Sequence, residues 1–401
     1  MNQGRIKIKI SKRHQGKIRK GFPWVYFYQL SQRNISGRPG DLGVIYDSAN
    51  RFLAIGLFDP FSDIRLRILQ TRNPCEIDEH FFRERLQAAL ALREPLQSQE
   101  TTAYRMVNGE NDGFPGMVVD RYDDTLVIKV YTSAWFPYLQ MLVSLLREES
   151  GSCQRVLLQL SRHVERVSEG SFKDNQMLFG AAPAGPVRFK ENGLSFEADL
   201  LHGQKTGFFL DQRDNRQQVR EQARGRSVLN VFSYTGAFSV YAWAGGAESV
   251  VEIDVNAQAQ AAALKNWELN FGAGDIQENR FRQIQGDAFA QLASLNRQGE
   301  QFDLVILDPP AFASRKQNKA NALQAYLRLA KAGAQCTRDG GLLLAASCSA
   351  QVRADEFYRA VDLGIRQTGR PYQKLLKTGH PLDHPVTFRE GAYLKAIYCQ
   401  F

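Results

Sequence analysis

The sequence predicts an α/β protein built in three parts: an N-terminal β-barrel, a central α+β domain and a C-terminal Rossmann-like domain. Its 401 residues exceed the roughly 150 of one average domain, and 43% apolar with 23% charged residues is typical of a globular chain. Over residues 191–401, strand-like and helix-like segments alternate, which indicates a parallel sheet covered by helices. Short strand-like runs separated by Gly, Pro, Asn and Asp fill residues 1–70 and indicate a small barrel or sandwich.

The first 40 residues carry the net charge of the protein. They contain ten Lys or Arg and no Asp or Glu, so the formal net charge of +9 belongs to this segment. A concentrated positive surface favours a polyanionic partner, and we prefer nucleic acid over a mere solubility tail. Charges alternate with Ile6, Ile8 and Ile10, which predicts a strand with one buried face. A basic loop then leads into GFPWVYFYQL, residues 21–30.

Residues 75–190 predict an α+β domain that orients the other two. A helix is expected over 77–96, a second near 136–149, and strands over MVVDRY, LVIKVY and VLLQL. The segment NGENDGFPG is dense in turn-forming residues. We expect its Glu110 and Asp112 to serve the turn rather than catalysis.

In residues 191–401 the informative side chains stand where predicted strands end. SYTGAF follows the strand VLNVF and contains a single glycine, Gly236, so the dinucleotide fingerprint G-x-G-x-x-G is missing and a nicotinamide oxidoreductase is disfavoured. Asp254 ends the strand VVEID, where a carboxylate can accept hydrogen bonds from ribose hydroxyls. Asp287 follows the next strand and is expected either to accept from an adenine amino group or to cap the following helix.

Two further strand ends carry the candidate chemistry. LDPPAFA places two prolines after Asp308, which fixes a rigid corner and presents this carboxylate to a pocket. Cys348 ends the strand GLLLAASC, level with Asp308, and is a candidate nucleophile. The other four cysteines are expected to be small buried apolar residues, and without a C-x-x-C pair neither disulfides nor zinc are supported. His380 and His384 are each followed by proline, so we assign no metal site.

Several strings together resemble one known family. GFPWVYFYQL, HGQKTGFFLDQRDNR (202–216), FSYTGAF (232–238), DPPAFA, SCS and DHPV (383–386) are similar to the 23S rRNA 5-methylcytosine methyltransferases that depend on S-adenosylmethionine (SAM). The resemblance covers nearly the whole chain. It implies a PUA-like RNA-binding domain over 1–70, a central domain over 75–190 and a class I methyltransferase domain over 191–401.

The resemblance and the strand ends together define the expected site residues. Catalysis is assigned to Cys348 and Asp308. Cofactor binding is assigned to the KTGFFLDQR segment and to the strand ends, namely Lys205, Thr206, Phe208, Asp211, Gln212, Arg213, Phe232, Tyr234, Thr235, Gly236, Asp254, Asp287, Asp308 and Pro309. RNA binding is assigned to Lys12, Arg13, Lys17, Arg19, Lys20 and Trp24. Of the aromatic residues Phe22, Trp24, Tyr26 and Tyr28, at least two are expected to divide between core and surface instead of stacking on bases.

The cysteine favours cytosine C5 as the methylated atom. Cytosine C5 becomes nucleophilic only after a thiolate has added to C6, which is covalent catalysis. Related enzymes carry a second cysteine just after the D-P-P-type proline, but Ala311 stands there, so another base or water is expected to take the C5 proton. Ala311 also stands where amino-group methyltransferases have an aromatic residue, which argues against an exocyclic amine as target. Methylation of guanine N7 on the same fold, and a non-catalytic RNA-binding assembly factor, remain the alternatives.

The expected partner is 23S rRNA or a precursor of the large ribosomal subunit, with SAM as cofactor. No run of 18 apolar residues occurs, which argues against a membrane partner. Charges in the first residues, MNQGRIKIKISKRHQGK, disfavour a signal peptide, so we expect a cytoplasmic protein. The sequence leaves open whether the protein forms a homodimer.

Overall fold

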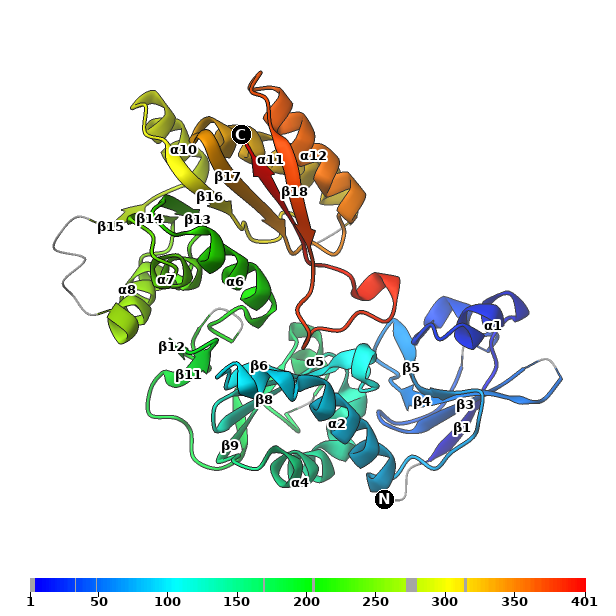
Figure 1. The fold of residues 1–401 in the computed structure, drawn as a ribbon. Coiled ribbons are helices and arrows are strands. Elements are labelled where there is room, and N and C mark those ends of the chain that lie inside the picture. Colours follow the sequence, from blue (N-terminus) through cyan, green and yellow to red (C-terminus); the bar gives the residue numbers. More distant parts are fainter. Residues whose placement is uncertain are drawn as a thin grey trace. The chain divides into compact units, whose positions relative to one another are not determined.

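The computed structural model describes residues 4–32, 34–47, 49–168, 170–203, 206–271, 280–313 and 316–401. It divides into two compact units (Figure 1). Unit 1 comprises the chain up to Val187 together with Leu382–Phe388, and unit 2 comprises Arg188–Pro381 with Arg389–Phe401. The short segment Leu382–Phe388 therefore belongs to unit 1, although its sequence neighbours on both sides belong to unit 2.

The first part of unit 1 is a five-stranded sheet. Its order is β1-β3-β4-β5-β2, with β1 and β3 parallel and the remaining pairs antiparallel. The strands are β1 (Arg5–Ile8), β2 (Trp24–Tyr26), β3 (Leu42–Tyr46), β4 (Phe52–Phe58) and β5 (Ile64–Thr71). Alternation along β1 buries Ile8 against Val25, Ile45 and Leu66, as the apolar spacing predicted.

The prediction of a basic loop before residue 21 is wrong, because this stretch forms helix α1 (Lys12–Arg19). Gln15 and Ile18 are three residues apart and therefore share the buried face of this helix. The four cations of the helix, Lys12, Arg13, Lys17 and Arg19, face solvent. The buried face of α1 contains one apolar residue, Ile18, beside the polar Gln15, which is too little to give a helical period of apolar residues.

The second part of unit 1 is another five-stranded sheet, ordered β10-β9-β8-β7-β6. Its strands are β6 (Ala103–Asn108), β7 (Met117–Tyr122), β8 (Thr125–Val130), β9 (Arg155–Leu160) and β10 (Gln176–Phe179). The helices are α2 (Glu79–Arg93), α3 (Pro95–Ser98), α4 (Leu139–Ser150) and α5 (Arg162–Val167). Helix α2 packs on α4 and β6, and an aromatic cluster of Phe82, Phe114, Trp135 and Tyr138 fills the core.

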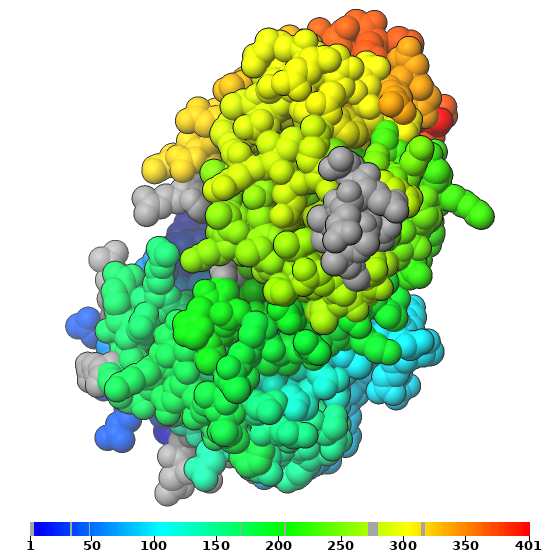
Figure 2. All heavy atoms as spheres, turned by 90° about the vertical axis from the view of Figure 1, so that its left-hand side faces the viewer, coloured from blue at the N-terminus to red at the C-terminus, as the bar shows by residue number. Residues whose placement is uncertain are grey.

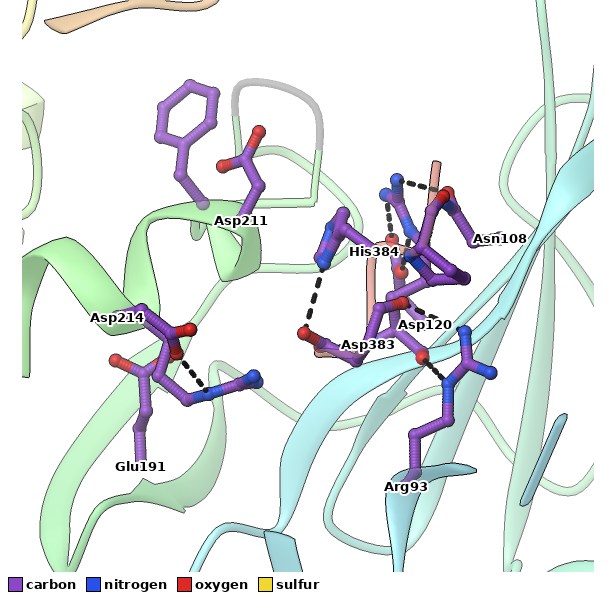
Figure 3. Close-up of polar contacts among 12 residues, drawn as sticks. Arg93, Asn108, Asp120, Glu191, Asp211, Asp214, Asp383 and His384 are labelled. Atoms are coloured by element: carbon purple, nitrogen blue, oxygen red, sulfur yellow. Dashed lines mark hydrogen bonds and ion pairs between the residues drawn. The ribbon is translucent and has the colours of Figure 1, made fainter. Parts of the chain in front are cut away.

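The hairpin β11 (Val187–Glu191) and β12 (Leu194–Ala198) belongs to unit 2 from its second residue onward, and α6 (Arg213–Gln222) follows it. A buried ion pair joins these elements, since the Arg216 guanidinium lies 2.7 Å from each carboxylate oxygen of Glu191. The Tyr241 hydroxyl donates to the same carboxylate at 3.0 Å, so the charged pair is fully hydrogen-bonded. Glu191 also lies in Figure 3, beside Asp214 of α6.

The main element of unit 2 is a seven-stranded sheet ordered β15-β14-β13-β16-β17-β19-β18. Its strands are β13 (Ser227–Val231), β14 (Ser249–Asp254), β15 (Phe281–Gln285), β16 (Phe302–Leu307), β17 (Thr337–Ser347), β18 (Gln373–Thr378) and β19 (Lys395–Gln400). Strands β13, β14, β15, β16 and β17 are all parallel, and β19 runs antiparallel to both of its neighbours, β17 and β18. The predicted Rossmann-like sheet is confirmed.

Helices cover both faces of this sheet (Figure 1). They are α7 (Ala237–Ala244), α8 (Ala257–Phe271), α10 (Ala288–Arg297), α11 (Lys319–Gln335) and α12 (Ala354–Arg366). Helix α8 contacts β14 and β15, and α10 contacts β14; their outer sides form the yellow-green and yellow surface of Figure 2. The strand order reverses between β13 and β16, so the carboxyl ends of these two strands mark the switch point where such sheets bind ligands.

Candidate active site

The loop after β13 has a strained backbone. Phe232 and Tyr234 adopt φ values of 63° and 49°, in the left-handed region that side chains other than glycine rarely occupy. Defined contacts hold them there: the Tyr234 amide donates to Asp254 Oδ2 at 2.8 Å, and the Asn266 side-chain amide donates to the Thr235 carbonyl at 2.9 Å. Such strain persists only where the surroundings fix it, and it is concentrated at functional sites.

Gly236 ends this loop, and its lack of a side chain lets Ala263 of α8 and the Glu252 side chain approach the loop closely. Its φ is 73°, and a Cβ at this position would lie 2.7 Å from Ala263 Cβ and 2.8 Å from Glu252 Oε1. Glu252 is completely buried on β14, and burial raises the pKa of its carboxyl to about 7. The single glycine noted in the sequence is therefore required by both conformation and space.

Asp254 and Asp287 stand at the two adjacent strand ends. Asp254 is half-buried, and its oxygens accept from the amides of Tyr234 and Asn256, each at 2.8 Å. Each carboxylate oxygen has a second acceptor site, so hydrogen bonds from ribose hydroxyls remain compatible with this arrangement. Asp287 is the N-cap of α10, where its side chain accepts from the Ala290 amide at 3.0 Å. The capping role is thus observed, and adenine binding by Asp287 stays a prediction.

Cys348 is held between two buried serines at the end of β17. The Ser347 hydroxyl donates to the Tyr326 hydroxyl at 2.8 Å, and the Ser349 hydroxyl donates to the Ala313 carbonyl at 2.9 Å. Both serines are completely buried, whereas Cys348 is half-buried. The flanking residues therefore fix the backbone and leave the thiol as the accessible group.

The other cysteines behave as the sequence predicted, as parts of the apolar core. Cys336 and Cys399 are buried, and burial raises their thiol pKa values to about 11 and about 12. Cys75 and Cys153 are half-buried against the core of unit 1, and burial raises the pKa of each. These four thiols are consequently poor sources of a thiolate at neutral pH.

Asp308 follows β16, the strand that lies between β13 and β17. Leu307 pairs with Val231 on one side and with Ala345 on the other, so Asp308 emerges at the same sheet edge as the loop after β13 and the cysteine. Burial raises the pKa of Tyr326 to about 12, and charges at Cys348 and Asp308 add to this rise. The two predicted catalytic groups therefore lie within electrostatic reach of one hydroxyl. Pro309, the next residue in the chain, is buried.

The residues of the KTGFFLDQR segment have different roles: some pack in the core, and others lie near the loop after β13. Lys205 lies outside the described residues. Thr206, Phe208, Gln212 and Arg213 are buried, and the Phe208 ring packs between Phe189, Phe196 and the Arg216 guanidinium. Asp211 is half-buried and accepts from the Tyr393 hydroxyl at 2.9 Å.

Phe209, which sequence reasoning passed over, is the residue of this segment that contacts the strained loop. Its ring packs edge-on against Tyr234, with 5.2 Å between the ring centroids. Two adjacent phenylalanines give no sequence signal for which of them faces the loop and which faces the core.

In unit 1 the five predicted RNA-binding cations lie on α1 or at its C-terminal end and are exposed. Arg19 forms an ion pair with Asp47 at 2.9 Å, whereas within the described part of the chain no ion pair joins Lys12, Arg13, Lys17 or Lys20 to an acid. Exposed cations are available to phosphates.

The aromatic residues beside α1 divide in exposure. Trp24 is half-buried with its indole N–H donated to Glu110 Oε1 at 2.7 Å, and Phe22 and Tyr26 are also half-buried. Tyr28 is exposed and stacks on Tyr26. Contact between Trp24 and an RNA base stays a prediction. The indole N–H of Trp24 already donates to Glu110, so such a contact would use the face of the ring.

Glu110 and Asp112 do more than form the turn. Glu110 also accepts from Arg67 at 3.1 Å, and the Asp112 carboxylate pairs with the buried Arg93 at 2.6 Å. The expectation of a turn role alone is thus too narrow, because these acids neutralise buried arginines that come from β5 and α2.

The DHPV string fastens Leu382–Phe388 to unit 1 (Figure 3). The Arg93 guanidinium donates to the Asp383 carbonyl at 2.8 Å, and the Arg105 amide donates to the Asp383 carboxylate at 2.9 Å. His384 is buried with Nδ1 3.1 Å from Asp383 Oδ1. The Asn108 side chain donates to the Pro385 carbonyl at 2.9 Å. The motif has a structural role that spacing alone could not reveal.

Neither a metal centre nor a membrane-spanning helix is found in the described ranges. No group of three or more His, Cys, Asp or Glu is arranged to hold a metal ion in the part of the chain that the structure describes. His380, one of the two histidines considered above, accepts from the Leu394 amide through Nε2 at 3.1 Å. Within the same ranges, no helix is long and apolar enough to cross a membrane.

Comparison with known proteins identifies the class and then the family. Residues 8–71 match the model of the PUA-like domain, and residues 173–362 match that of the S-adenosylmethionine-dependent methyltransferase. A Streptococcus mutans protein assigned as a SAM-dependent methyltransferase has the same fold, with a TM-score of 0.83, 23% identity, and coverage of 99% of this chain and 100% of its own. A second solved structure, of a methyltransferase complexed with SAH, gives a TM-score of 0.83 at 22% identity over 100% of both chains. The protein is thus a SAM-dependent methyltransferase with a PUA-like domain.

Relatives extend over the full length of the chain. The "Ribosomal RNA large subunit methyltransferase" of Deinococcus radiodurans is 44% identical, covering 99% of this chain and 97% of the relative. The "Ribosomal RNA large subunit methyltransferase I" of Shewanella denitrificans is 34% identical, covering 98% of each. The chain belongs to this family of ribosomal RNA large subunit methyltransferases.

The sheet edge of unit 2 fits the cofactor of this class. The Phe232–Gly236 loop follows β13 at the switch point of the sheet, and Asp254 offers acceptors at the neighbouring strand end. The Ser233 hydroxyl in the same loop is buried without a hydrogen-bond partner among the described residues, so it is available to hydrogen-bond a ligand. We therefore expect Phe232–Gly236 and Asp254 to hold SAM.

Proposed function

We propose that this protein transfers a methyl group from SAM to C5 of a cytosine in the 23S rRNA of the large ribosomal subunit, through a covalent adduct with Cys348. One observation carries the proposal: a half-buried cysteine, fixed by two buried serines, ends β17 at the sheet edge shared with Asp308 and the strained loop. The names of the full-length relatives support large-subunit rRNA as the substrate.

Cys348 divides the reaction into easier steps. Its thiolate adds to C6 of cytosine, the S–C6 bond forms, and the electron pair of the C5–C6 double bond becomes available at C5. Bound SAM supplies an electrophilic methyl group for C5. Loss of the C5 proton to a base then restores the double bond, and cleavage of the S–C6 bond returns the thiolate. Ala311 stands where a second cysteine would serve as that base, so water or another group takes the proton.

Asp308 and Pro309 are suited to hold the edge of the base. Asp308 is half-buried at the end of a central strand and is followed by two prolines, which limit its movement. A protonated carboxyl in this position can donate to N3 of cytosine, which draws electron density from C6 and assists thiolate addition.

We also propose a division of labour along the chain. Residues 1–70 bind RNA through the exposed cations of α1, residues 75–190 connect, and residues 191–401 carry out the transfer. The match of 8–71 to the PUA-like domain supports the first assignment.

Nucleoside analysis tests the reaction. Purified protein is incubated with labelled SAM and deproteinised large-subunit rRNA from cells lacking this protein, and we expect label in 5-methylcytidine. Label in 7-methylguanosine would retain the fold and cofactor and discard the covalent cysteine. Absence of label both on naked rRNA and on assembled large subunits would contradict the proposal.

Replacement of the nucleophile gives the largest effect that we predict. Cys348→Ala should lower turnover by about three orders of magnitude or more, because removing a covalent nucleophile abolishes the step on which the others depend. Affinity for SAM, measured by calorimetry, should stay within about twofold. Cys153→Ala, which removes a half-buried thiol of unit 1, is the matched control and should retain activity. Full methylation by the Cys348→Ala variant would exclude the adduct.

A further inference from the structure

Lys395 is a buried lysine next to the cysteine loop. It is the first residue of β19, pairs with Ser347 in the antiparallel register of β17 and β19, and is only 3% exposed. Lysine is almost never fully buried unless its charge has partners. Its position beside the residue that precedes Cys348 therefore calls for a physical reason.

The ammonium group of Lys395 organises the backbone after Cys348. Nζ donates to the carbonyls of Ser349 at 2.5 Å, Val352 at 2.7 Å and Tyr393 at 3.0 Å. An ammonium has three hydrogens, and these three acceptors use all of them. Two of the acceptors lie in the loop that follows Cys348, so Lys395 joins that loop to the start of β19.

The positive charge of Lys395 is not neutralised by a direct ion pair. Within the described ranges no carboxylate lies within salt-bridge distance of its ammonium, and its hydrogen bonds go to neutral carbonyls. Glu356 acts on it from α12, but this carboxylate is paired with Lys319 at 2.6 Å. A buried cation without a bound anion stabilises negative charge that develops nearby.

The cysteine and the lysine are within electrostatic reach of each other. Burial lowers the pKa of Lys395 to about 8, and an ionised Cys348 acts in the opposite direction and raises it. This interaction is reciprocal, since the Coulomb energy between two charges belongs to the pair. At neutral pH most Lys395 is therefore an ammonium, and its charge favours the thiolate form of Cys348.

Among the described residues, the other titratable groups that act on this pair are Tyr326, Asp308 and Glu356, and none of them is a cation. Tyr326, on α11, is linked to Ser347 and feels the charge of Cys348, but burial keeps its hydroxyl protonated by raising its pKa to about 12. Asp308 opposes the thiolate when ionised. Glu356, from α12, is also acidic.

We propose that Lys395 is a positioning residue that fixes the loop after Cys348 and stabilises the Cys348 thiolate. Its significance for catalysis rests on the proposed covalent function, but the ionisation of the thiol is measurable without any methyl transfer. A buried, fully hydrogen-bonded cation is suited to this task because solvent and salt screen it little.

The wild-type protein provides the first test. Alkylation by iodoacetamide is followed as a function of pH, and peptide mass spectrometry reports each cysteine separately. Cys348 should be half-ionised at a pH below the ordinary cysteine value of about 8.5. Cys75 and Cys153, whose thiol pKa values burial raises, should react only at higher pH. Half-ionisation of Cys348 at or above the ordinary value would overturn the proposal, with no variant needed.

Lys395→Met tests the charge itself. We expect the midpoint of Cys348 alkylation to rise by about one pH unit or more, which lowers the alkylation rate at pH 7 about tenfold. Lys395→Arg should recover most of the shift because it keeps the charge. Lys374→Met is the matched control, since Lys374 lies on β18 and pairs with Asp362 at 2.5 Å. It should leave the Cys348 midpoint unchanged.

The outcomes separate this inference from the proposed function. An unchanged Cys348 midpoint in a Lys395→Met variant that still binds SAM would overturn the role of Lys395, even if 5-methylcytidine is formed. A raised midpoint together with label in 7-methylguanosine would confirm the electrostatic role and overturn the covalent function alone.

Discussion

The basic surface of α1 and the strand-end edge of unit 2 use polar groups in opposite ways. On α1 and at its C-cap Lys20 five cations are exposed, and only Arg19 among them is joined to an acid in the described part of the chain. At the strand-end edge, which comprises Phe232–Gly236, Asp308–Ala313 and Ser347–Val352, buried serines and a buried lysine hold the backbone through defined hydrogen bonds. The RNA recognition that we propose for α1 would be a sum of similar small electrostatic contributions, whereas the geometry of the edge depends on single hydrogen bonds. One substitution should therefore matter far more at the edge.

Gly236→Ala should show the largest effect of a single added atom at the edge. The new Cβ would lie 2.7 Å from Ala263 Cβ, at a φ of 73°. Strain of about 1–3 kcal/mol in the loop corresponds to a rise in the SAM dissociation constant of roughly five- to 150-fold, measured by calorimetry.

Gly299→Ala is the control that separates the effect of a positive φ from the effect of a steric clash. Gly299 has nearly the same φ, 74°, but no atom lies within 4 Å of its added Cβ. This variant should lose about 1 kcal/mol of stability and keep its affinity for SAM. Equal SAM affinities of the two variants would refute the assignment of the Phe232–Gly236 loop to the cofactor.

Glu252→Gln should change how stability depends on pH. The folded-state pKa of about 7 exceeds the ordinary value of 4.5, so between these values the folded protein binds more protons than the unfolded chain. The free energy of unfolding of the wild type therefore falls as pH rises from about 4.5 to about 7 and then levels off.

The Gln variant lacks this fall. Its stability relative to wild type should improve by on the order of 3 kcal/mol between pH 4.5 and pH 8, in urea unfolding followed by fluorescence. Glu248→Gln, at an exposed position just before β14, should leave the pH dependence unchanged. Parallel pH curves for wild type and Glu252→Gln would show that this carboxyl is ionised in the folded protein at pH 5.

Charge on α1 should have the smallest effect per residue. Simultaneous reversal of Lys12, Arg13, Lys17 and Lys20 to Glu should weaken rRNA binding about tenfold or more and flatten its dependence on salt, whereas one reversal alone should change little. Arg19 is left intact because it pairs with Asp47. Filter binding at several salt concentrations measures the slope. Reversal of Arg359 and Arg366, exposed on α12, is the control, and an unchanged slope in the α1 variant would exclude phosphate contacts by this helix.

The sequence predicted the strand ends well because their signals are local. An apolar run followed by Gly236, Asp254 or Asp308 shows where a strand stops, and parallel strands bring such ends to one edge. Cys348 stood out for the same reason. The three-part division of the chain stays a prediction, since the boundaries 1–70, 75–190 and 191–401 differ in kind from the two compact units.

Contacts between distant segments gave no comparable signal. Lys395 reaches the cysteine loop only through the register of β17 and β19, and Asp383 reaches Arg93 from 290 positions away in the sequence. Helix α1 was missed because its buried face consists of two residues. In each case the determining partner lies on another element, where residue type and spacing cannot indicate it.

The most direct test of the covalent mechanism is to trap the adduct. An rRNA fragment that contains 5-fluorocytidine is incubated with the protein and SAM, and the mixture is separated under denaturing conditions. Fluorine at C5 cannot leave as a proton does, so the S–C6 bond should persist, and we expect an RNA-linked protein whose modified peptide contains Cys348. Failure to form this species with an enzyme that methylates the unsubstituted fragment would contradict the covalent role of Cys348.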